Sequence, residues 1–298
     1  MKQKTREQIC PKVPYKKTEK GIIITGGYDG DATLVLPDEI EGEPVAGIDD
    51  YAFARAENLK EIWLPSFVTE IGRYAFYRCR ELKKLILTDS LLDIGGGAFT
   101  GCGLSEVEIH FQSGEKSCLK SIVDEIRFAI RAELYYKNGV AKVLFPEHYE
   151  EAVENTPARI LVTHHHGAGG YYRQCFYNRE LDYKKYDELL FRTVVEEEPN
   201  IAAELVLNRL RYPFHLERKS KEAYEQYLKE HLEEGVKFLV ETEDLDGFRF
   251  FCRENYWTEK TLGRAMEFAA QAQKTEILSF LMDEKHRRFP IKKKTFEL

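Results

Sequence analysis

The 298-residue sequence has no apolar run long enough to span a membrane as a helix, which takes about 20 residues. Residues 1–20 are charged from the second position onward and lack an apolar stretch, so we expect no secretory signal. The six cysteines show neither paired C-x-x-C spacing nor the density of a secreted disulfide scaffold. These absences predict a cytoplasmic protein with reduced thiols and no membrane partner.

The sequence also lacks an excess of positive charge. It holds 44 Lys and Arg against 51 Asp and Glu, a formal net charge of −7. Residues 1–20 carry seven basic and two acidic side chains, which leaves −12 for the remainder. An acidic surface repels a phosphate backbone, so we predict no nucleic-acid binding and interpret residues 1–20 as a solvated basic tail.

A phrase that recurs every 23 residues dominates the first third of the chain. It reads IDDYAFARAENLKEIWL from Ile48, IGRYAFYRCRELKKLIL from Ile71 and IGGGAFTGCGLSEVEI from Ile94. Each copy contains an alanine-phenylalanine pair and ends in an apolar triplet, which comes one residue early in the third copy. The phenylalanines and triplets are Phe53, Phe76 and Phe99, and Leu59/Ile62/Leu64, Leu82/Leu85/Leu87 and Leu104/Val107/Ile109. A partial earlier unit, residues 34–37, matches residues 62–65.

This repetition predicts a solenoid. The spacing L-x-x-L-x-L gives a short strand with alternate apolar side chains pointing inward, and the alanine-phenylalanine pair lies on a turn opposite the strand. A single coil cannot bury its apolar face alone, so each coil must stack on the next.

Residues of about 28–111 resemble the bacterial BspA-like leucine-rich repeat family. The phrase that carries the resemblance, IgxxAFxxCxxLxxIxLP, is present from Ile71 to Leu87 and in the copy from Ile48 to Pro65. The resemblance implies a right-handed solenoid that contacts other proteins and has no catalytic residues. Family members are often exported, so a surface adhesin is an alternative.

The segment after the repeats has mixed α and β patterns. Apolar spacing predicts a helix over residues 117–129, and an Asn138-Gly139 turn predicts a hairpin within residues 130–146. A further strand, residues 158–166, ends at the glycine-rich residues 167–170. We expect this α/β connector to close the open end of the solenoid.

From residue 182 onward the pattern is helical. A helix is predicted to begin at Pro199, and an apolar stripe from Tyr224 to Leu239 predicts one core-facing helix. Residues 236–251 align with residues 266–281 without a gap at an offset of 30 residues. This resembles ankyrin-type helix pairs loosely, and chance similarity between amphipathic helices is the alternative.

The most enzyme-like cluster surrounds a histidine run. On a strand, His164 and His166 share a face and could ligate a metal with Glu150, Glu154 or Cys175, and Arg159, Arg173, Tyr171 and Tyr172 lie nearby in the sequence. The simpler interpretation is a strand end that enters a glycine loop. The glycines at 95–97 and 167–170 match no phosphate-binding motif and are interpreted as turns.

The predicted partner-binding surface is the outward face of the solenoid strands. Strand alternation directs residues between the inward triplet positions to the outside. Stacked coils then place Val35, Trp63, Ile86 and Glu108 in one row, with three exposed apolar side chains in line. The candidate residues are Val35, Glu61, Trp63, Lys84, Ile86, Glu106 and Glu108.

Together these patterns predict an α+β protein. Its parts are a basic tail (1–20), a short leucine-rich repeat solenoid (21–112), an α/β connector or cap (113–181) and a helical, repeat-like domain (182–298). The predicted function is a non-enzymatic cytoplasmic scaffold that binds another protein and needs no cofactor or metal. The alternatives are an enzyme or metal-binding protein with a site around His164, His166 and Arg173, and an exported adhesin.

Overall fold

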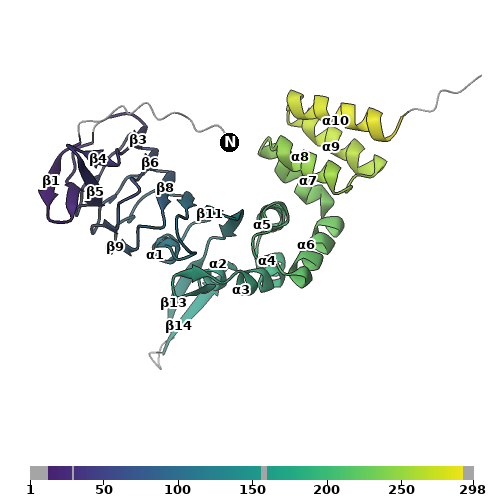
Figure 1. The fold of residues 1–298 in the computed structure, drawn as a ribbon. Helices are drawn as coiled ribbons and strands as arrows, with labels where there is room; N and C mark the ends of the chain where they lie inside the picture. Colours follow the sequence, from purple (N-terminus) through teal and green to yellow (C-terminus); the bar gives the residue numbers. More distant parts are fainter. Residues whose placement is uncertain (1–12, 29, 156–159, 291–298) are drawn as a thin grey trace, which may run out of the picture. The chain divides into compact units, whose positions relative to one another are not determined.

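The computed structural model describes residues 13–28, 30–155 and 160–290, without the side chains of residues 150–155 and 160–165. Figure 1 shows strands in the first part of the chain and helices in the last part. The chain divides into two compact units, Met1–Glu196 and Glu197–Leu298. The predicted α+β solenoid followed by a helical domain is confirmed.

Five parallel strands and one antiparallel strand form the main sheet of the solenoid, sheet B. In spatial order they are β3 (Thr33–Val35), β6 (Glu61–Trp63), β8 (Lys84–Thr88), β10 (Glu106–His110), β11 (Ile130–Tyr136) and β12 (Gly139–Phe145). Leu34, Ile62, Leu85 and Val107 are paired in register across the first four strands and are buried, as the 23-residue spacing predicts.

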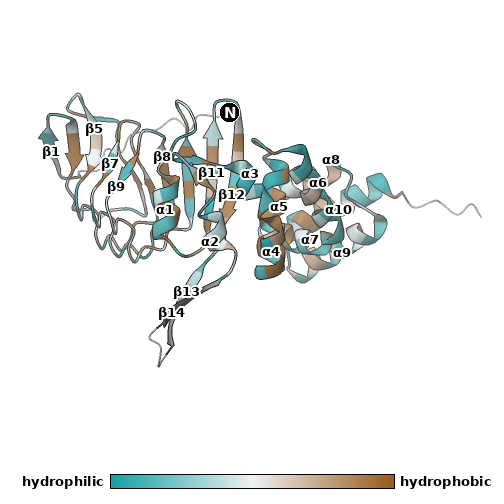
Figure 2. Ribbon diagram, turned by 90° about the horizontal axis from the view of Figure 1, so that it is seen from below, coloured by the Kyte–Doolittle hydropathy of each residue, from teal (hydrophilic) through white to brown (hydrophobic). Residues whose placement is uncertain are grey.

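A second sheet, sheet A, covers another side of the coils. It contains β1 (Tyr15–Thr18), β2 (Gly21–Ile24), β5 (Glu43–Ile48), β7 (Glu70–Ile71) and β9 (Asp93–Ile94), and β4 (Glu39–Ile40) pairs with β5. Figure 2 shows that β2 is hydrophobic whereas β1 is hydrophilic. The assignment of residues 1–20 to a solvated tail is therefore wrong for Tyr15–Thr18, which pair antiparallel with β2 and cover its edge.

The solenoid core contains a stack of identical side chains. The rings of Phe53, Phe76 and Phe99 are buried and nearly parallel, with centroids 5.3 and 5.5 Å apart. The thiols of Cys79 and Cys102 donate to the carbonyls of Phe53 and Phe76, one coil earlier, at 2.9 and 2.8 Å. Like side chains therefore stack on like side chains through successive coils, which confirms the predicted register.

Helix α1 (Leu119–Glu125) and the β11–β12 hairpin end the stack. Earlier coils pair backbone to backbone: Phe53 N–H donates to Ala75 O and Phe76 N–H to Ala98 O, both at 2.8 Å. In the last coil, Phe99 N–H donates to the carboxylate of Glu125 at 2.7 Å. A side chain of α1 thus replaces the carbonyl that another coil would supply. Since β11 continues sheet B parallel to β10, the coils extend beyond the predicted limit at residue 112.

The rest of the first unit connects to the helical region. It contains β13 (Tyr149–Asn155), β14 (Ile160–His166), α2 (Gly169–Tyr172), β15 (Phe176–Tyr177), β16 (Glu180–Leu181), α3 (Tyr183–Glu188) and α4 (Leu190–Glu196). The hydroxyl of Tyr186 donates to Leu144 O at 2.7 Å and accepts from Leu144 N–H at 2.9 Å. Because α3 is bonded to β12 in this way, the first unit continues to Glu196 and does not end at the predicted residue 181.

The second unit consists of α5 (Pro199–Arg211), α6 (Arg218–Glu230), α7 (Leu232–Glu241), α8 (Leu245–Arg253), α9 (Glu259–Gln271) and α10 (Thr275–Arg288). Pro199 occupies the first turn of α5, as predicted. The prediction of one helix from Tyr224 to Leu239 is wrong. His231, with φ −118° and ψ 40°, leaves the helical region and separates α6 from α7, although the apolar stripe runs through the break.

The α7–α8 and α9–α10 pairs share a turn geometry at the 30-residue offset. Glu243 and Gln273 have φ of 55° and 57°. The next N–H in each turn reaches the same acceptor position: Asp244 donates to Leu239 O at 3.0 Å and Lys274 to Ala269 O at 2.9 Å. The backbone therefore repeats where the side chains match only weakly. The resemblance to ankyrin pairs stays a prediction.

Candidate functional site

The outward face of sheet B contains the predicted row of side chains. Val35 pairs with Trp63, Trp63 with Ile86, and Ile86 with Glu108 across β3, β6, β8 and β10. The register continues to Glu133 on β11 and from there to Lys142 on β12. A second outward row contains Glu61, Lys84 and Glu106, the remaining candidate residues. Sheet pairing thus brings all seven candidate residues onto one face.

The expectation that three apolar side chains in this row are exposed is wrong. Ile86 is 3% exposed, and Val35 and Trp63 are half-buried. Neighbouring strands lie about 4.8 Å apart, so the long side chains of Trp63 and Glu108 on either side exclude water from Ile86. The indole N–H of Trp63 donates to the Glu61 carboxylate, which holds the ring along the sheet.

Glu108 is the electrostatic centre of this face. Its carboxylate lies 2.7 Å from His110 Nε2 and 2.8 Å from Lys84 Nζ. The hydrogen bond with His110, with the charge and hydrogen bond of Lys84, outweighs partial burial and lowers the pKa of Glu108 to about 2. Burial lowers the pKa of Lys84, but the contact with Glu108 outweighs it and raises the pKa overall. Glu108 is therefore a fixed carboxylate, whereas Glu106 in the neighbouring row is exposed.

The face continues onto the hairpin, which the sequence analysis did not include. Glu133 accepts from Lys142 Nζ at 2.5 Å and from the Tyr135 hydroxyl at 2.6 Å. Tyr135 stacks on His110 with ring centroids 4.9 Å apart. The alternation of outward Arg131, Glu133 and Tyr135 was visible in the sequence as part of the predicted hairpin. The sequence pattern did not show that β11 pairs with β10, which brings these residues onto the same face.

The alternative site around the histidine run has a structural arginine at its centre. Arg173 is 2% exposed, and within the described part of the chain its guanidinium donates to backbone carbonyls. Its acceptors are Val123 O at 2.7 Å, Pro146 O at 2.5 Å, Gly169 O and Phe128 O at 3.0 Å, Ile126 O at 2.9 Å and Arg127 O at 3.4 Å. Burial lowers the pKa of Arg173 to about 10. Arg173 thus connects α1, the loop that follows it and α2 through hydrogen bonds.

Among the other members of this predicted site, the structure describes the side chains of His166, Tyr171, Tyr172 and Cys175. Burial raises the pKa of the Cys175 thiol to about 12, which disfavours the nucleophilic thiolate. The side chains of Glu150, Glu154 and His164, and all of Arg159, lie outside the described residues. Among side chains that are described, no group of three or more His, Cys, Asp or Glu could hold a metal ion. None of the described helices combines the length and apolar content of a membrane span.

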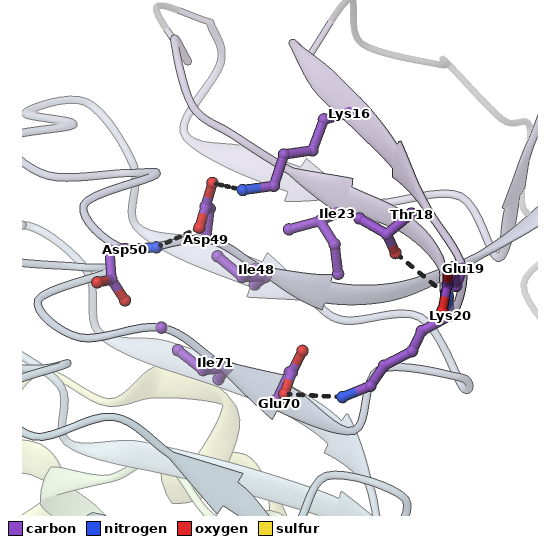
Figure 3. Close-up of a pocket in the computed structure, with 11 residues that line it drawn as sticks. Lys16, Thr18, Glu19, Lys20, Ile23, Ile48, Asp49, Asp50, Glu70 and Ile71 are labelled. Atoms are coloured by element: carbon purple, nitrogen blue, oxygen red, sulfur yellow. Dashed lines mark hydrogen bonds and ion pairs between the residues drawn. The ribbon is translucent and has the colours of Figure 1, made fainter.

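A cavity of about 570 Å³ lies against the outward side of sheet A (Figure 3). Lys16 from β1 forms an ion pair with Asp49, and Lys20 from the hairpin turn lies 3.8 Å from Glu70. Ile23 contributes an apolar surface between these pairs. The lysines are matched with carboxylates across the cavity, but these pairs are largely exposed and add little to the stability of the hairpin.

Comparison with known proteins supports the repeat assignment. The family model for the BspA type leucine rich repeat region matches residues 46–150 in six copies. This range includes β11 and β12, in agreement with the continued sheet. No curated protein matches the chain.

Two solved structures are similar to parts of the chain. The leucine-rich repeat protein of T. pallidum is 25% identical over 32% of this chain and 68% of its own, with a TM-score of 0.23. A leucine-rich repeat protein from Bacteroides ovatus is 20% identical over 42% of this chain and 39% of its own, with a TM-score of 0.27.

Proposed function

Since residues 46–150 form a BspA-type leucine-rich repeat region, we propose that the protein is a non-enzymatic scaffold that binds another protein. We place the binding surface on the outward face of sheet B, around Trp63, Lys84 and Glu106. The observation that carries the proposal is the continuous register of this face over six strands, from β3 to β12.

The chemistry of the face favours a protein partner over a small molecule. Trp63 and Tyr135 are half-buried aromatics held by Glu61 and Glu133, so little side-chain entropy is lost when a partner covers them. Interface hot spots are enriched in such aromatic side chains. The charges of Lys84 and Glu106 on neighbouring strands give polar positions beside them.

A pull-down with the full chain as bait tests the proposal, with Trp63→Ala and Glu106→Arg as variants. Both variants should lose the captured protein, because hot-spot truncation costs about 2 kcal/mol or more in binding. Glu106→Arg should leave the melting temperature nearly unchanged because Glu106 is exposed, whereas Trp63→Ala should also lower it because the indole is half-buried next to Ile86. Tyr177→Ala is the matched control, since Tyr177 is 77% exposed and lies outside this face. Capture that survives both variants would place the binding surface elsewhere.

We also propose that the protein acts in the cytoplasm and does not bind nucleic acid or membranes. The support for location is that Cys79, Cys102, Cys118, Cys175 and Cys252 are free thiols, as in a reducing compartment. Fractionation of the producing cells tests this location. Recovery of the chain on the cell surface would favour the exported adhesin instead.

A further inference from the structure

A second cavity lies on the segments that lead from sheet A back to sheet B. Its volume is about 490 Å³, and it is lined by Arg55, Glu57, Arg78, Arg80 and Glu81. These residues belong to the first two full copies of the repeat, on the side of the coils that carries the alanine-phenylalanine turns. The cavity therefore shares no residue with the outward face of sheet B.

The arginines of this cavity have no carboxylate partner within the described part of the chain. No ion pair within 4.0 Å joins Arg55, Arg78 or Arg80 to an acidic side chain there, and Arg78 contacts the ring of Tyr77, 5.1 Å from its centroid. By contrast, the nearby Arg73 forms a 3.1 Å ion pair with Asp50. Three guanidinium groups thus line one cavity with their donors available.

The backbone at two of these positions is unfavourable for arginine. Arg55 and Arg78 occupy the same position in consecutive coils, with φ of 63° and 60°. The third coil has Gly101 at this position, with φ of 75°. Because the left-handed region strains any residue with a Cβ, glycine suits the fold better than arginine at this position.

The like charges of Arg55 and Arg78 add a second, smaller cost. Their backbone N–H groups donate to Tyr77 O and Thr100 O of the following coils at 2.8 and 2.9 Å, which sets the side chains one coil apart. Because both side chains are exposed, solvent and salt screen most of the repulsion between their charges. The left-handed backbone at Arg55 and Arg78, where the third coil has glycine, therefore gives the stronger indication that these arginines serve a purpose other than folding.

The third coil has smaller residues at the positions equivalent to Arg78 and Arg80. It carries Gly101 and Gly103 in place of the larger side chains of the earlier copies. A Cβ at Gly103 would meet Lys83 Nζ at 2.8 Å, so this ammonium group lies over the glycine and adds positive charge beside Arg80. The coil that follows the arginine-lined cavity therefore has small residues and one further positive charge at these positions.

We propose that this cavity binds carboxylate side chains of an acidic segment of a partner protein. The guanidinium fork matches a carboxylate in geometry and charge. Glu57 and Glu81 on the cavity wall repel any anion that lies over them, carboxylates included, so the cavity suits one or two carboxylates placed at the guanidinium groups better than a continuous phosphate backbone. The exposed Tyr51 and Tyr74 rings, stacked 5.2 Å apart on neighbouring coils, provide adjoining aromatic contact area.

Fluorescence anisotropy of the full chain with a labelled hexaglutamate peptide tests this site. The double variant Arg78→Gln/Arg80→Gln should bind the peptide about tenfold more weakly or worse. Arg73→Gln is the matched control and should bind like the parent, because Asp50 already neutralises Arg73. Equal affinity of the parent and the double variant, or equal affinity of a hexaglutamine peptide, would overturn the proposal. So would tighter binding of an oligothymidylate through the same arginines.

A second pair of substitutions separates binding from folding. Arg55→Gly/Arg78→Gly introduces the residue that the third coil already has, so the melting temperature should change little, because relief of the left-handed strain offsets the greater unfolded-state entropy of glycine. Peptide affinity should fall at the same time. A loss of cooperative unfolding or a large drop in melting temperature would show that the arginines maintain the fold, and retained affinity would show that they do not form the site. Either result would refute the assignment of this cavity as a carboxylate-binding site. Neither result tests the proposed partner-binding face of sheet B.

Discussion

Both units of this protein contain repeats, but the solenoid repeats side-chain identity whereas the helical unit repeats backbone turn geometry. In the solenoid, identical side chains recur because each one packs on its own copy, as Phe76 does between Phe53 and Phe99. In the helical unit, the turns at Glu243 and Gln273 repeat while the side chains of the helix pairs diverge. Stacking of like on like constrains residue identity, whereas packing of unlike helix faces constrains only the apolar pattern.

The same difference appears in how the units end their elements. Helix α9 is capped locally, since the Thr258 and Thr261 side chains each accept from the backbone N–H of the other. The last coil of the solenoid is capped from a distance, by the carboxylate of Glu125 on Phe99 N–H. The end of the solenoid therefore depends on a side chain from a later element, whereas the start of α9 is satisfied by residues of its own first turn.

The largest expected effect contrasts Phe76 with Phe280. Phe76 is fully buried between two rings, so Phe76→Ala should destabilise the first unit by about 3 to 5 kcal/mol through lost burial and a cavity. Phe280 is half-buried on α10, so Phe280→Ala should destabilise the second unit by only about 1 to 2 kcal/mol.

Urea unfolding can follow the two units separately because each holds one tryptophan, Trp63 or Trp257. Variants with a single tryptophan, made by Trp257→Phe or Trp63→Phe, report one unit each. Equal losses for Phe76→Ala and Phe280→Ala would remove the proposed distinction between the units.

These contacts also explain what the sequence could predict. The 23-residue register and the phenylalanine stack were predictable because each side chain in the solenoid core packs on the same residue type in the next coil. The outward row was predictable as a row, but the burial of Ile86 was not, since it depends on the length of the Trp63 and Glu108 side chains next to it. The role of Arg173 was equally hidden, because its carbonyl acceptors lie as far as 50 residues away in the sequence.

A smaller effect is expected at the end of the stack. Glu125→Ala leaves the Phe99 N–H without its acceptor and should destabilise the first unit by about 1 to 3 kcal/mol. Glu125→Gln keeps an acceptor oxygen and should remain within about 1 kcal/mol of the parent. Chemical unfolding followed through Trp63 measures both variants.

The pH dependence of Glu125 gives a further check on this cap. Burial raises the pKa of the Glu125 carboxyl despite the bond from Phe99. A raised pKa in the folded state means that this group favours folding at low pH and that its contribution is lost as pH rises through that value. Glu125→Gln should abolish this component. Identical stability of the alanine and glutamine variants would mean that the coil end needs no acceptor.

The smallest predicted effect has the opposite sign and lies on the outward face of sheet B. The contacts with His110 and Lys84 lower the pKa of Glu108 from its ordinary 4.5 to about 2. A lowered pKa means that the contribution is fully present above the unfolded-state value and is lost as pH falls toward 2. We expect this contribution to be about 1 to 2 kcal/mol, since its partners are partly solvated.

Glu108→Gln should therefore lower stability at neutral pH and make the free energy of unfolding less dependent on pH on the acid side. Urea unfolding of the first unit between neutral pH and pH 3 measures this. If the free energy of unfolding of Glu108→Gln falls with decreasing pH as steeply as that of the parent, other carboxylates are responsible for the acid dependence. The Lys84–Glu108 ion pair between neighbouring coils would then contribute no more to the free energy of unfolding than an exposed ion pair of the helical unit, such as Arg264–Glu233.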